Sequence, residues 1–377
     1  MAAPTPDIRG LRIQMEPLFG RVFSDDLEHA YSYVDQLCLH LCFRVARECQ
    51  LFKFPAASLG LLVARANVAP DAVYLVQAII DVLCEEGFLG RTTAGFLVVR
   101  QCPPDESDWL QRRARAACSE ATPIYELIGR CHEHAVEFVT GRKTGLAVVF
   151  ERGDMDLWKR VHTIDSVMSI YADLVAPIVE AIARPGLRVL EVGGGVGAVL
   201  QRCLSIFDRL QLDHFCFTDL GQSFVQNARR AYGGDRRLSF ARVDLDLPLR
   251  DQGLVRESFD VVVAVNVLHA VKHLPFSLRE LLGVLKPRGQ LILSEGSPPS
   301  RARRWRLDLV FGFLRGWWDI STQPGWRPYP GFLLPRQWKG ALVACGYEHV
   351  HRLPGEDWFH GPCRGGAVLA RKQDQPH

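Results

Sequence analysis

The stretch VLEVGGGVGA, residues 189–198, organises the rest of the chain. Its apolar residues up to Val192 predict a buried parallel strand, and its glycines predict a sharp turn into a helix that begins at Ala198. Glycine suits this turn because the backbone needs positive φ and a ligand needs a close approach. The helix directs N–H groups and the positive end of its dipole toward the turn. We therefore expect the loop to hold a nucleotide.

The loop fits two nucleotide-binding patterns. The first is G-x-G-x-x-A (193–198), the dinucleotide fingerprint, with an acidic residue, Asp219, ending the next predicted strand. The second is E-x-G-x-G-x-G (191–197), the pattern of S-adenosylmethionine-dependent methyltransferases, in which the acidic residue lies near the methionine ammonium. The loop by itself leaves both open.

Length and composition limit the class of protein. A chain of 377 residues with 48% hydrophobic residues is long enough for two domains. The net charge of +3 gives no reason to expect nucleic acid, and without a run of 18 apolar residues we expect no membrane span. No apolar segment follows Met1, so we expect no signal peptide. The 11 cysteines are scattered without a CxxC pair, which favours a reduced, cytoplasmic protein.

Residues 1–105 are expected to form a winged-helix-like dimerisation domain. After a loose arm (1–20), helical spacing over 27–49, a short helix ending near Ala66 and a longer helix over 70–86 precede two short apolar segments. That order is typical of a winged helix. The helix in the position of a recognition helix, 71–84, carries no Lys or Arg, so we expect this domain not to bind nucleic acid. We expect it to form a homodimer instead.

Residues 106–183 are expected to form a helical linker and lid. A polar connection over 101–122 precedes helical periodicity over 123–139 and 154–183. Cys131-His132-x-His134 could be read as metal ligands, but neighbouring positions on one helix point apart and no second cluster follows, so we expect no metal. Tyr171, on the last of these helices, is a candidate to cover the cofactor.

Residues 184–377 alternate between predicted strands and helices, which indicates an α/β fold with a Rossmann-like parallel sheet covered on both faces. The expected strands are 187–192, 215–219, 238–243, 259–265, 290–295, 348–353 and 367–371. The expected helices are 198–207, 222–232, 277–285 and 335–345.

Ligands of such sheets bind at the carboxyl ends of the strands. The cofactor-binding candidates at these ends, together with Tyr171, are Glu191, Gly193, Gly195, Gly197, Asp219, Leu220, Asp244, Leu245 and Asn266. Asp219 is best placed for the ribose diol and Asp244 for the adenine amino group. Any one carboxylate could instead cap a helix, but capping does not explain the whole set.

His269 follows the buried strand 259–265, and Glu295 ends the neighbouring strand. An imidazole at the crevice can act as a general base near neutral pH, and a carboxylate bonded to it fixes its tautomer and raises its basicity. The alternative is a capping histidine beside a solvated glutamate. The residues alone leave both open.

Residues from about 150 to 350 resemble the C-methyltransferase domains of polyketide synthases. The matching stretches are LEVGGGVGAVL (190–200), FTDLGQSFVQNAR (217–229), FDVVVAVNVLHAVKHL (259–274), LLGVLKPRGQLILSEG (281–296) and DLVFGFLRGWW (308–318). The resemblance implies S-adenosylmethionine as cofactor and His269 with Glu295 as the catalytic dyad, methylating the α-carbon of a β-ketoacyl substrate. We expect a free-standing chain that takes a small-molecule or carrier-bound acyl acceptor. An O-methyltransferase of small molecules is the alternative.

The long insertion over 296–334 is rich in aromatic residues. Long insertions in compact domains are usually functional, and pockets are lined by aromatic side chains, so this one is expected to cover the acceptor pocket. The substrate-binding candidates are Phe311, Trp317, Trp318 and Tyr329. The alternative is a core helix.

Overall fold

The computed structural model describes residues 6–51, 53, 58–151, 155–210, 212–298, 306–355 and 365–373. The chain forms two compact units, each built from separate stretches of sequence. The sheet unit comprises Met1–Ser24, Ser169–Ser300 and Asp319–His377, and the helical unit comprises Asp25–Met168 and Arg301–Trp318.

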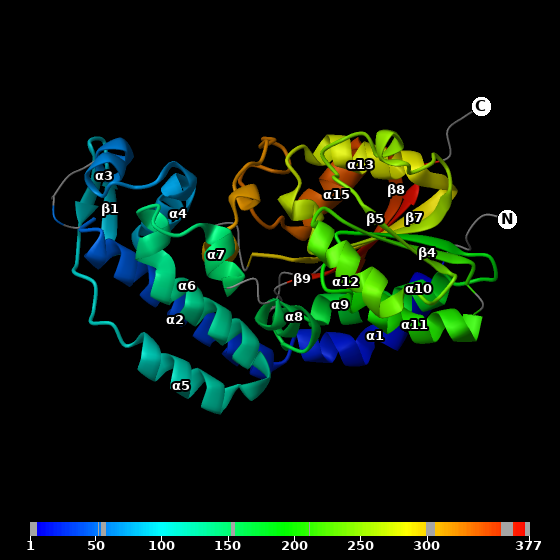
Figure 1. The fold of residues 1–377 in the computed structure, drawn as a ribbon, viewed down its shortest axis with the longest axis horizontal. Helices are drawn as coiled ribbons and strands as arrows, with labels where there is room; N and C mark the ends of the chain where they lie inside the picture. Colours follow the sequence, from blue (N-terminus) through cyan, green and yellow to red (C-terminus); the bar gives the residue numbers. More distant parts are fainter. Residues whose placement is uncertain are drawn as a thin grey trace. The chain divides into compact units, whose positions relative to one another are not determined.

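A seven-stranded sheet in the order β5-β4-β3-β6-β7-β9-β8 is the centre of the sheet unit (Figure 1). The first five strands in this order are parallel, whereas β9 is antiparallel to both β7 and β8. The bounds are β3 Arg188–Val192, β4 His214–Asp219, β5 Leu238–Arg242, β6 Phe259–Val265, β7 Leu285–Gly296, β8 Tyr347–Leu353 and β9 Gly365–Lys372. The predicted α/β fold is thus confirmed.

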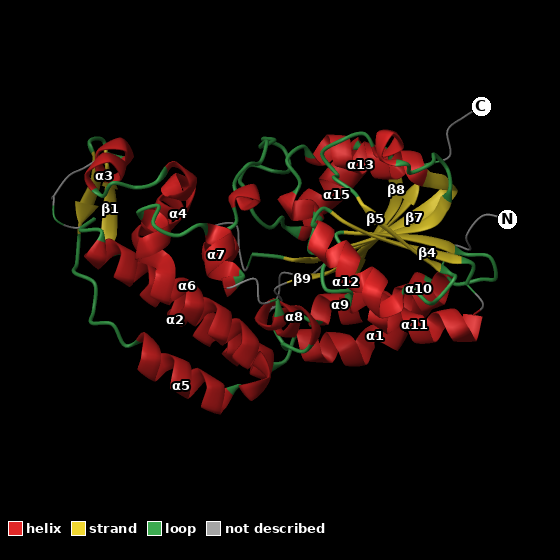
Figure 2. Ribbon diagram, in the orientation of Figure 1, coloured by secondary structure: helices red, strands yellow, loops and turns green. Residues whose placement is uncertain are grey.

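Helices cover both faces of this sheet. In Figure 2, α13 and α15 lie on one face, and α1, α9, α10 and α11 lie on the other. The bounds are α1 Ile8–Val22, α9 Ile170–Asp173, α10 Val175–Ile182, α11 Ala198–Leu210, α12 Gln222–Tyr232, α13 Leu274–Val284 and α15 Pro335–Ala344. With both faces covered, β6 is buried almost throughout, which explains the apolar run 261–265 that makes up most of it.

The helical unit begins with three helices and a two-stranded hairpin, the order expected of a winged helix. These elements are α2 Asp25–Glu48, α3 Leu59–Arg65, α4 Val73–Glu85, β1 Leu89–Thr92 and β2 Gly95–Val98. The others are α5 Ser107–Ala117, α6 Thr122–Val139, α7 Gly145–Val149, α8 Asp156–Thr163 and α14 Asp308–Phe311. The proline at the predicted start of α3, Pro55, lies outside the described residues. Among the described residues, no helix is long and apolar enough to cross a membrane, and no cluster of His, Cys, Asp and Glu suits a metal ion.

Three local expectations are wrong. The loose arm over 1–20 contains α1, in which Asp7 caps the first turn and Leu11, Met15, Phe19 and Val22 form a buried stripe. The connection over 101–122 contains α5, whose buried side chains are only Leu110 and Ala114. The single helix expected over 154–183 is three shorter ones, α8, α9 and α10; residue 154 lies outside the described part.

The observed units also divide the chain differently from the expected segments 1–105, 106–183 and 184–377. Residues up to Ser24 join the sheet unit, and 301–318 join the helical unit. Sequence order conceals this division because it shows breaks in composition and not which distant segments pack together.

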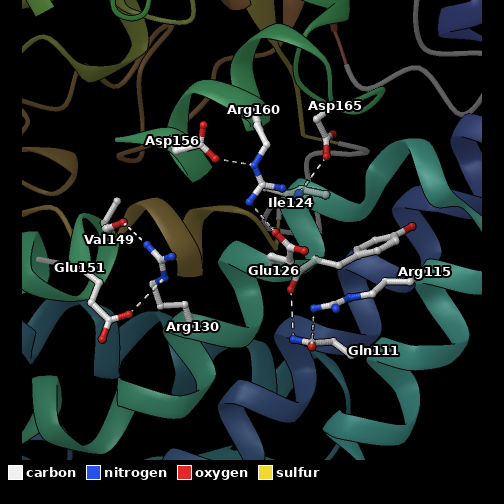
Figure 3. Close-up of polar contacts among 11 residues, drawn as sticks. Gln111, Arg115, Ile124, Glu126, Arg130, Val149, Glu151, Asp156, Arg160 and Asp165 are labelled. Atoms are coloured by element: carbon white, nitrogen blue, oxygen red, sulfur yellow. Dashed lines mark hydrogen bonds and ion pairs between the residues drawn. The ribbon is translucent and has the colours of Figure 1, made fainter. Parts of the chain in front are cut away.

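Polar contacts join α6 to its neighbours in the helical unit (Figure 3). Arg130 donates to the carbonyl of Val149 at 3.2 Å, and Arg160 bridges Glu126 at 2.8 Å and Asp156 at 2.9 Å. The buried carboxylate of Asp165 accepts the backbone N–H of Ile124 at 2.8 Å, in the first turn of α6. The bonds to the N–H of Ile124 and the carbonyl of Val149 satisfy groups that an isolated helix end leaves without partners.

Asp165 should make the stability of the protein depend on pH. Burial raises the pKa of Asp165 to about 7, although backbone N–H donors oppose the shift. The folded state therefore holds a proton that the unfolded state releases near pH 4, so stability falls as pH rises from about 4 to 7, by up to about 1.4 kcal/mol per pH unit. Asp165→Asn removes this dependence, and the free energy of unfolding of wild type minus variant should decrease over that range in urea titrations.

Asp156→Asn is the matched control, since Asp156 has an exposed side chain (69%) on the neighbouring helix. Its difference from wild type gives the effect of an Asp-to-Asn change at an exposed position, with which the Asp165→Asn result is compared. A flat difference for Asp165→Asn would show that its carboxyl ionises alike in both states.

Candidate active site

The glycine loop leaves β3 at the carboxyl edge of the sheet. Gly193, Gly195 and Gly197 all have positive φ, at 64°, 52° and 80°. A Cβ on Gly193 would lie 2.4 Å from Cγ2 of Val267, so this position needs glycine for space as well as for conformation. The predicted cradle at the start of α11 is therefore present.

Asp219, at the end of β4, holds the loop in place. Its Oδ2 accepts the N–H of Gly195 at 2.9 Å, and its Oδ1 accepts the N–H of Gly221 at 2.7 Å. Burial raises the pKa of Asp219, and these two N–H donors partly offset the shift. The carboxylate thus links the glycine loop to the start of α12. The neighbouring Leu220 is exposed, at 55%.

Glu191 lies one residue before the end of β3 and is almost fully buried. Its Oε2 has no hydrogen-bond partner among the described residues. Burial, and then the charge of Asp219, raise the pKa of Glu191 well above its ordinary range. A cation beside this carboxylate would favour its ionised form.

The loop after β5 carries the next carboxylate pair. Asp244 is half-buried, and its backbone N–H donates to Oε1 of Gln252 at 2.7 Å. Its side chain accepts the N–H of Asp246 at 2.9 Å. Leu245, between them, is buried. Asp246 is not among the residues predicted from sequence.

His269 and Glu295 meet in a buried pair. His269 lies on the short 3-10 helix η5 (Leu268–Ala270) after β6, and Glu295 lies near the end of β7. Nδ1 of His269 is 2.6 Å from Oε2 of Glu295, and the two side chains are each 3% exposed. The other carboxylate oxygen accepts the backbone N–H groups of Val267 at 3.1 Å and Leu268 at 3.0 Å.

This geometry assigns the histidine tautomer. With an acceptor on Nδ1, that nitrogen carries the proton, and Nε2 carries the lone pair. Asn266 supports the arrangement: it takes positive φ (47°) and its Oδ1 accepts the N–H of Gly296 at 2.9 Å. The strand-end positions predicted from sequence therefore come together at one edge of the sheet.

Two further residues contact His269. Arg327, fully buried, donates through Nη1 to the carbonyl of Val271 at 2.7 Å and through Nη2 to the carbonyl of His269. Burial lowers the pKa of Arg327 to about 10, with the carboxylates of Asp246 and Glu295 opposing, so it stays cationic at neutral pH. The ring of Phe332 stacks on the imidazole with centroids 4.0 Å apart.

Sequence reasoning missed Arg327 and Phe332, although both lie in the insertion it singled out. The aromatic residues of the insertion were predicted to line a pocket, and its arginines were not considered. A buried arginine cannot be distinguished from a surface arginine in a single sequence. The only sequence feature that could have drawn attention to Arg327 is its place between Trp326 and Pro328.

Tyr171 is buried within the sheet unit at the same edge. A Cβ on Gly365 would lie 2.4 Å from its Cε1, so the ring packs against the first residue of β9. Gly365 pairs with Gly296, the residue after Glu295. Tyr171 is therefore near the end of β7, and its role as a cofactor cover stays a prediction.

The four aromatic candidates for the acceptor divide between the units. Phe311, Trp317 and Trp318 belong to the helical unit, where they are buried and Nε1 of Trp318 donates to the carbonyl of Gly312 at 2.8 Å. Tyr329 belongs to the sheet unit and is 69% exposed. The three buried rings pack as a core does, while their role toward an acceptor stays a prediction.

Comparison with known proteins agrees with this architecture. A family described as a methyltransferase domain matches residues 190–291. The chain is 31% identical over 230 residues to polyketide synthase PksR of Bacillus subtilis (strain 168), which covers 57% of this chain and 9% of that protein. The chain thus corresponds to less than a tenth of this relative's length.

Solved structures share the fold. The CurJ carbon methyltransferase matches with a TM-score of 0.86 at 22% identity, over 98% of this chain and 100% of that one. The trans-methyltransferase CalH, in a complex with SAH, matches with a TM-score of 0.69 at 19% identity, over 93% of each chain.

The strand-end residues fit S-adenosylmethionine. At Gly195 only the carbonyl oxygen of Gly193 lies within 4 Å of where a Cβ would be, so the glycine loop has open space there, and Glu191 presents a buried carboxylate oxygen without a partner among the described residues. The cofactor has a nucleoside to occupy such a loop and a methionine ammonium to pair with such a carboxylate. By sequence, fold and fit, the chain is an S-adenosylmethionine-dependent methyltransferase that is similar in sequence to polyketide synthases and in fold to carbon methyltransferases.

Proposed function

We propose that this enzyme methylates the acidic α-carbon of a β-ketoacyl substrate, with His269 as general base and Glu295 as the group that orients it. The buried 2.6 Å contact between Nδ1 of His269 and Oε2 of Glu295 carries the proposal. That contact puts the imidazole proton on Nδ1. Nε2 is therefore the atom whose lone pair accepts the α-proton. The carboxylate then stabilises the imidazolium that forms.

The cofactor supplies an electrophilic methyl group when bound. Glu191 would hold its ammonium, Asp219 its ribose hydroxyls and Asp244 its adenine amino group. Leu220, Leu245, Asn266 and Tyr171 would complete the surface around it. Loss of the α-proton to His269 leaves an enolate whose carbon is nucleophilic, so the protein contributes base catalysis and orientation.

The acceptor class comes from the relatives. PksR is named a polyketide synthase and CurJ a carbon methyltransferase, which favours an acyl chain methylated on carbon, on a carrier protein or as a free small molecule. Homodimerisation through the winged-helix-like region stays a prediction, as does the absence of nucleic-acid binding. Helix α4, in the recognition position, carries Asp81 and neither Lys nor Arg.

Asp219→Ala should weaken binding of S-adenosylmethionine by about 10- to 150-fold, the value of one hydrogen bond to a charged group at roughly 1.5–3 kcal/mol. The change also releases the N–H of Gly195, so the glycine loop loses a support. Isothermal titration calorimetry measures the effect. Asp213→Ala is the control, because Asp213 precedes β4 at the opposite edge and is 55% exposed. Equal affinity in both variants would exclude Asp219 from the cofactor site.

His269→Ala should lower kcat by roughly 10²–10⁴-fold, the usual contribution of a positioned base, and leave cofactor affinity intact. The assay follows methyl transfer from radiolabelled cofactor to acetoacetyl-N-acetylcysteamine thioester. His214→Ala, at the other edge of the sheet, should behave as wild type.

Glu295→Gln should also be strongly impaired. If its oxygen keeps the N–H groups of Val267 and Leu268, its NH₂ group faces Nδ1 of His269 and places the imidazole proton on Nε2, the wrong tautomer. An analogue whose α-carbon is fully substituted should be inert in every variant. Methylation of that analogue on oxygen would favour an O-methyltransferase. Near-normal turnover by His269→Ala would contradict the proposed base.

Trp318→Ala separates an acceptor role from packing. Trp318 is buried, so its removal should destabilise the protein by about 3–5 kcal/mol if it only packs. If it also lines the acceptor site, KM for the thioester should rise while cofactor affinity stays constant. Trp338→Ala, which removes a buried tryptophan of α15 in the sheet unit, is the comparison for stability. A lowered Tm with unchanged KM would assign Trp318 to the core alone.

A further inference from the structure

The segment that carries His269 is held by charged side chains from three other parts of the sheet unit. We call residues 267–273 the dyad turn. Glu295 accepts the N–H groups at its start, those of Val267 and Leu268. Asp246 accepts the N–H groups at its end, those of residues 272 and 273, each at 3.0 Å. Two carboxylates thus accept the backbone N–H groups at the two ends of the turn.

Arg327 binds backbone carbonyl groups in the middle of the dyad turn. Its guanidinium donates to the carbonyls of His269 and Val271, so one planar fork spans the residue that carries the imidazole. It lies near the carboxylates of Asp246 and Glu295, which stabilise its charge. The turn is therefore held by an anion at each end and a cation between them.

Arg327 is itself fixed to the dyad turn through its own segment. Its backbone forms two hydrogen bonds with Gln323, at 2.6 and 2.8 Å. Two residues earlier, the N–H of Ser321 donates to the carbonyl of Lys272 at 2.9 Å. On the other side of Arg327, Phe332 stacks on the imidazole of His269. The segment 321–332 thus contacts the turn repeatedly.

We propose that Arg327 is a positioning residue for methyl transfer, which acts through His269 by fixing the backbone of the dyad turn. The proposal rests on His269 being the base. A base displaced by about 1 Å can lose 10²-fold in rate, so loosening of this turn is enough to impair catalysis. Lysine keeps the charge and loses the planar fork, and therefore cannot span both carbonyls as arginine does.

The test is a double-mutant cycle. Four proteins are compared, the wild type, Arg327→Met, His269→Ala and the double variant, by the rate of radiolabelled methyl transfer to the same thioester at saturating cofactor. In the protein that keeps His269, Arg327→Met should lower kcat by about 10- to 100-fold. In the His269→Ala protein the same change should cause no further loss in kcat, because the base that Arg327 positions is already absent. Cofactor affinity should stay constant, and Arg327→Lys should fall between wild type and Arg327→Met.

Arg352→Met is the matched control. Arg352 is a second buried arginine of the sheet unit, on β8, and its loss should leave kcat close to that of wild type. If Arg327→Met fails to fold, Arg327→Lys enters the cycle in its place with a smaller expected loss of about 3- to 10-fold.

The possible outcomes separate the two proposals. An equal loss from the Arg327 change in both backgrounds, or no loss in either, would overturn the positioning role. Near-normal turnover by His269→Ala would instead overturn the base assignment, whatever Arg327 does. Loss of cofactor affinity in Arg327→Met would show that Arg327 supports the cofactor site and does not act through His269.

Discussion

The carboxylate of Glu295 is the interaction on which the candidate active site depends. One of its oxygens contacts the imidazole of His269 and the other accepts two backbone N–H groups of the segment that carries this histidine. Side chain and backbone are therefore fixed by the same group. A buried carboxylate is stable only with such partners, and here they include the residue proposed to remove the proton.

Sequence predicted the centre of the sheet well because the strands there are buried on both faces. The apolar run 261–265 of β6 and the glycines after β3 each allow one structural reading once strands alternate with helices. The order of strands then places the ends of β6 and β7 side by side, which is why His269 and Glu295 could be expected to meet. Their contact is present, and their chemical role stays a prediction.

The features that were not predicted from sequence depend on packing between distant segments, which a single sequence does not show. Helix α1 carries an apolar stripe, although residues 1–20 were expected to be a loose arm. Arg327 and Asp246 were missed because each stabilises backbone groups of a segment far along the chain. The aromatic residues of the insertion drew attention correctly to this region, yet aromatic content alone does not distinguish a lining from a core.

The interleaving of the two units has a consequence for synthesis on the ribosome. Helix α1 emerges first but packs on α10, which is made about 150 residues later, and the helical unit is complete only when α14 follows β7. Neither unit can therefore finish folding before most of the other has been translated. A cut before residue 184 would separate α1, α9 and α10 from the strands of the sheet unit, which all follow that residue. Expression of either unit alone would accordingly require joining its separate stretches into a new chain order.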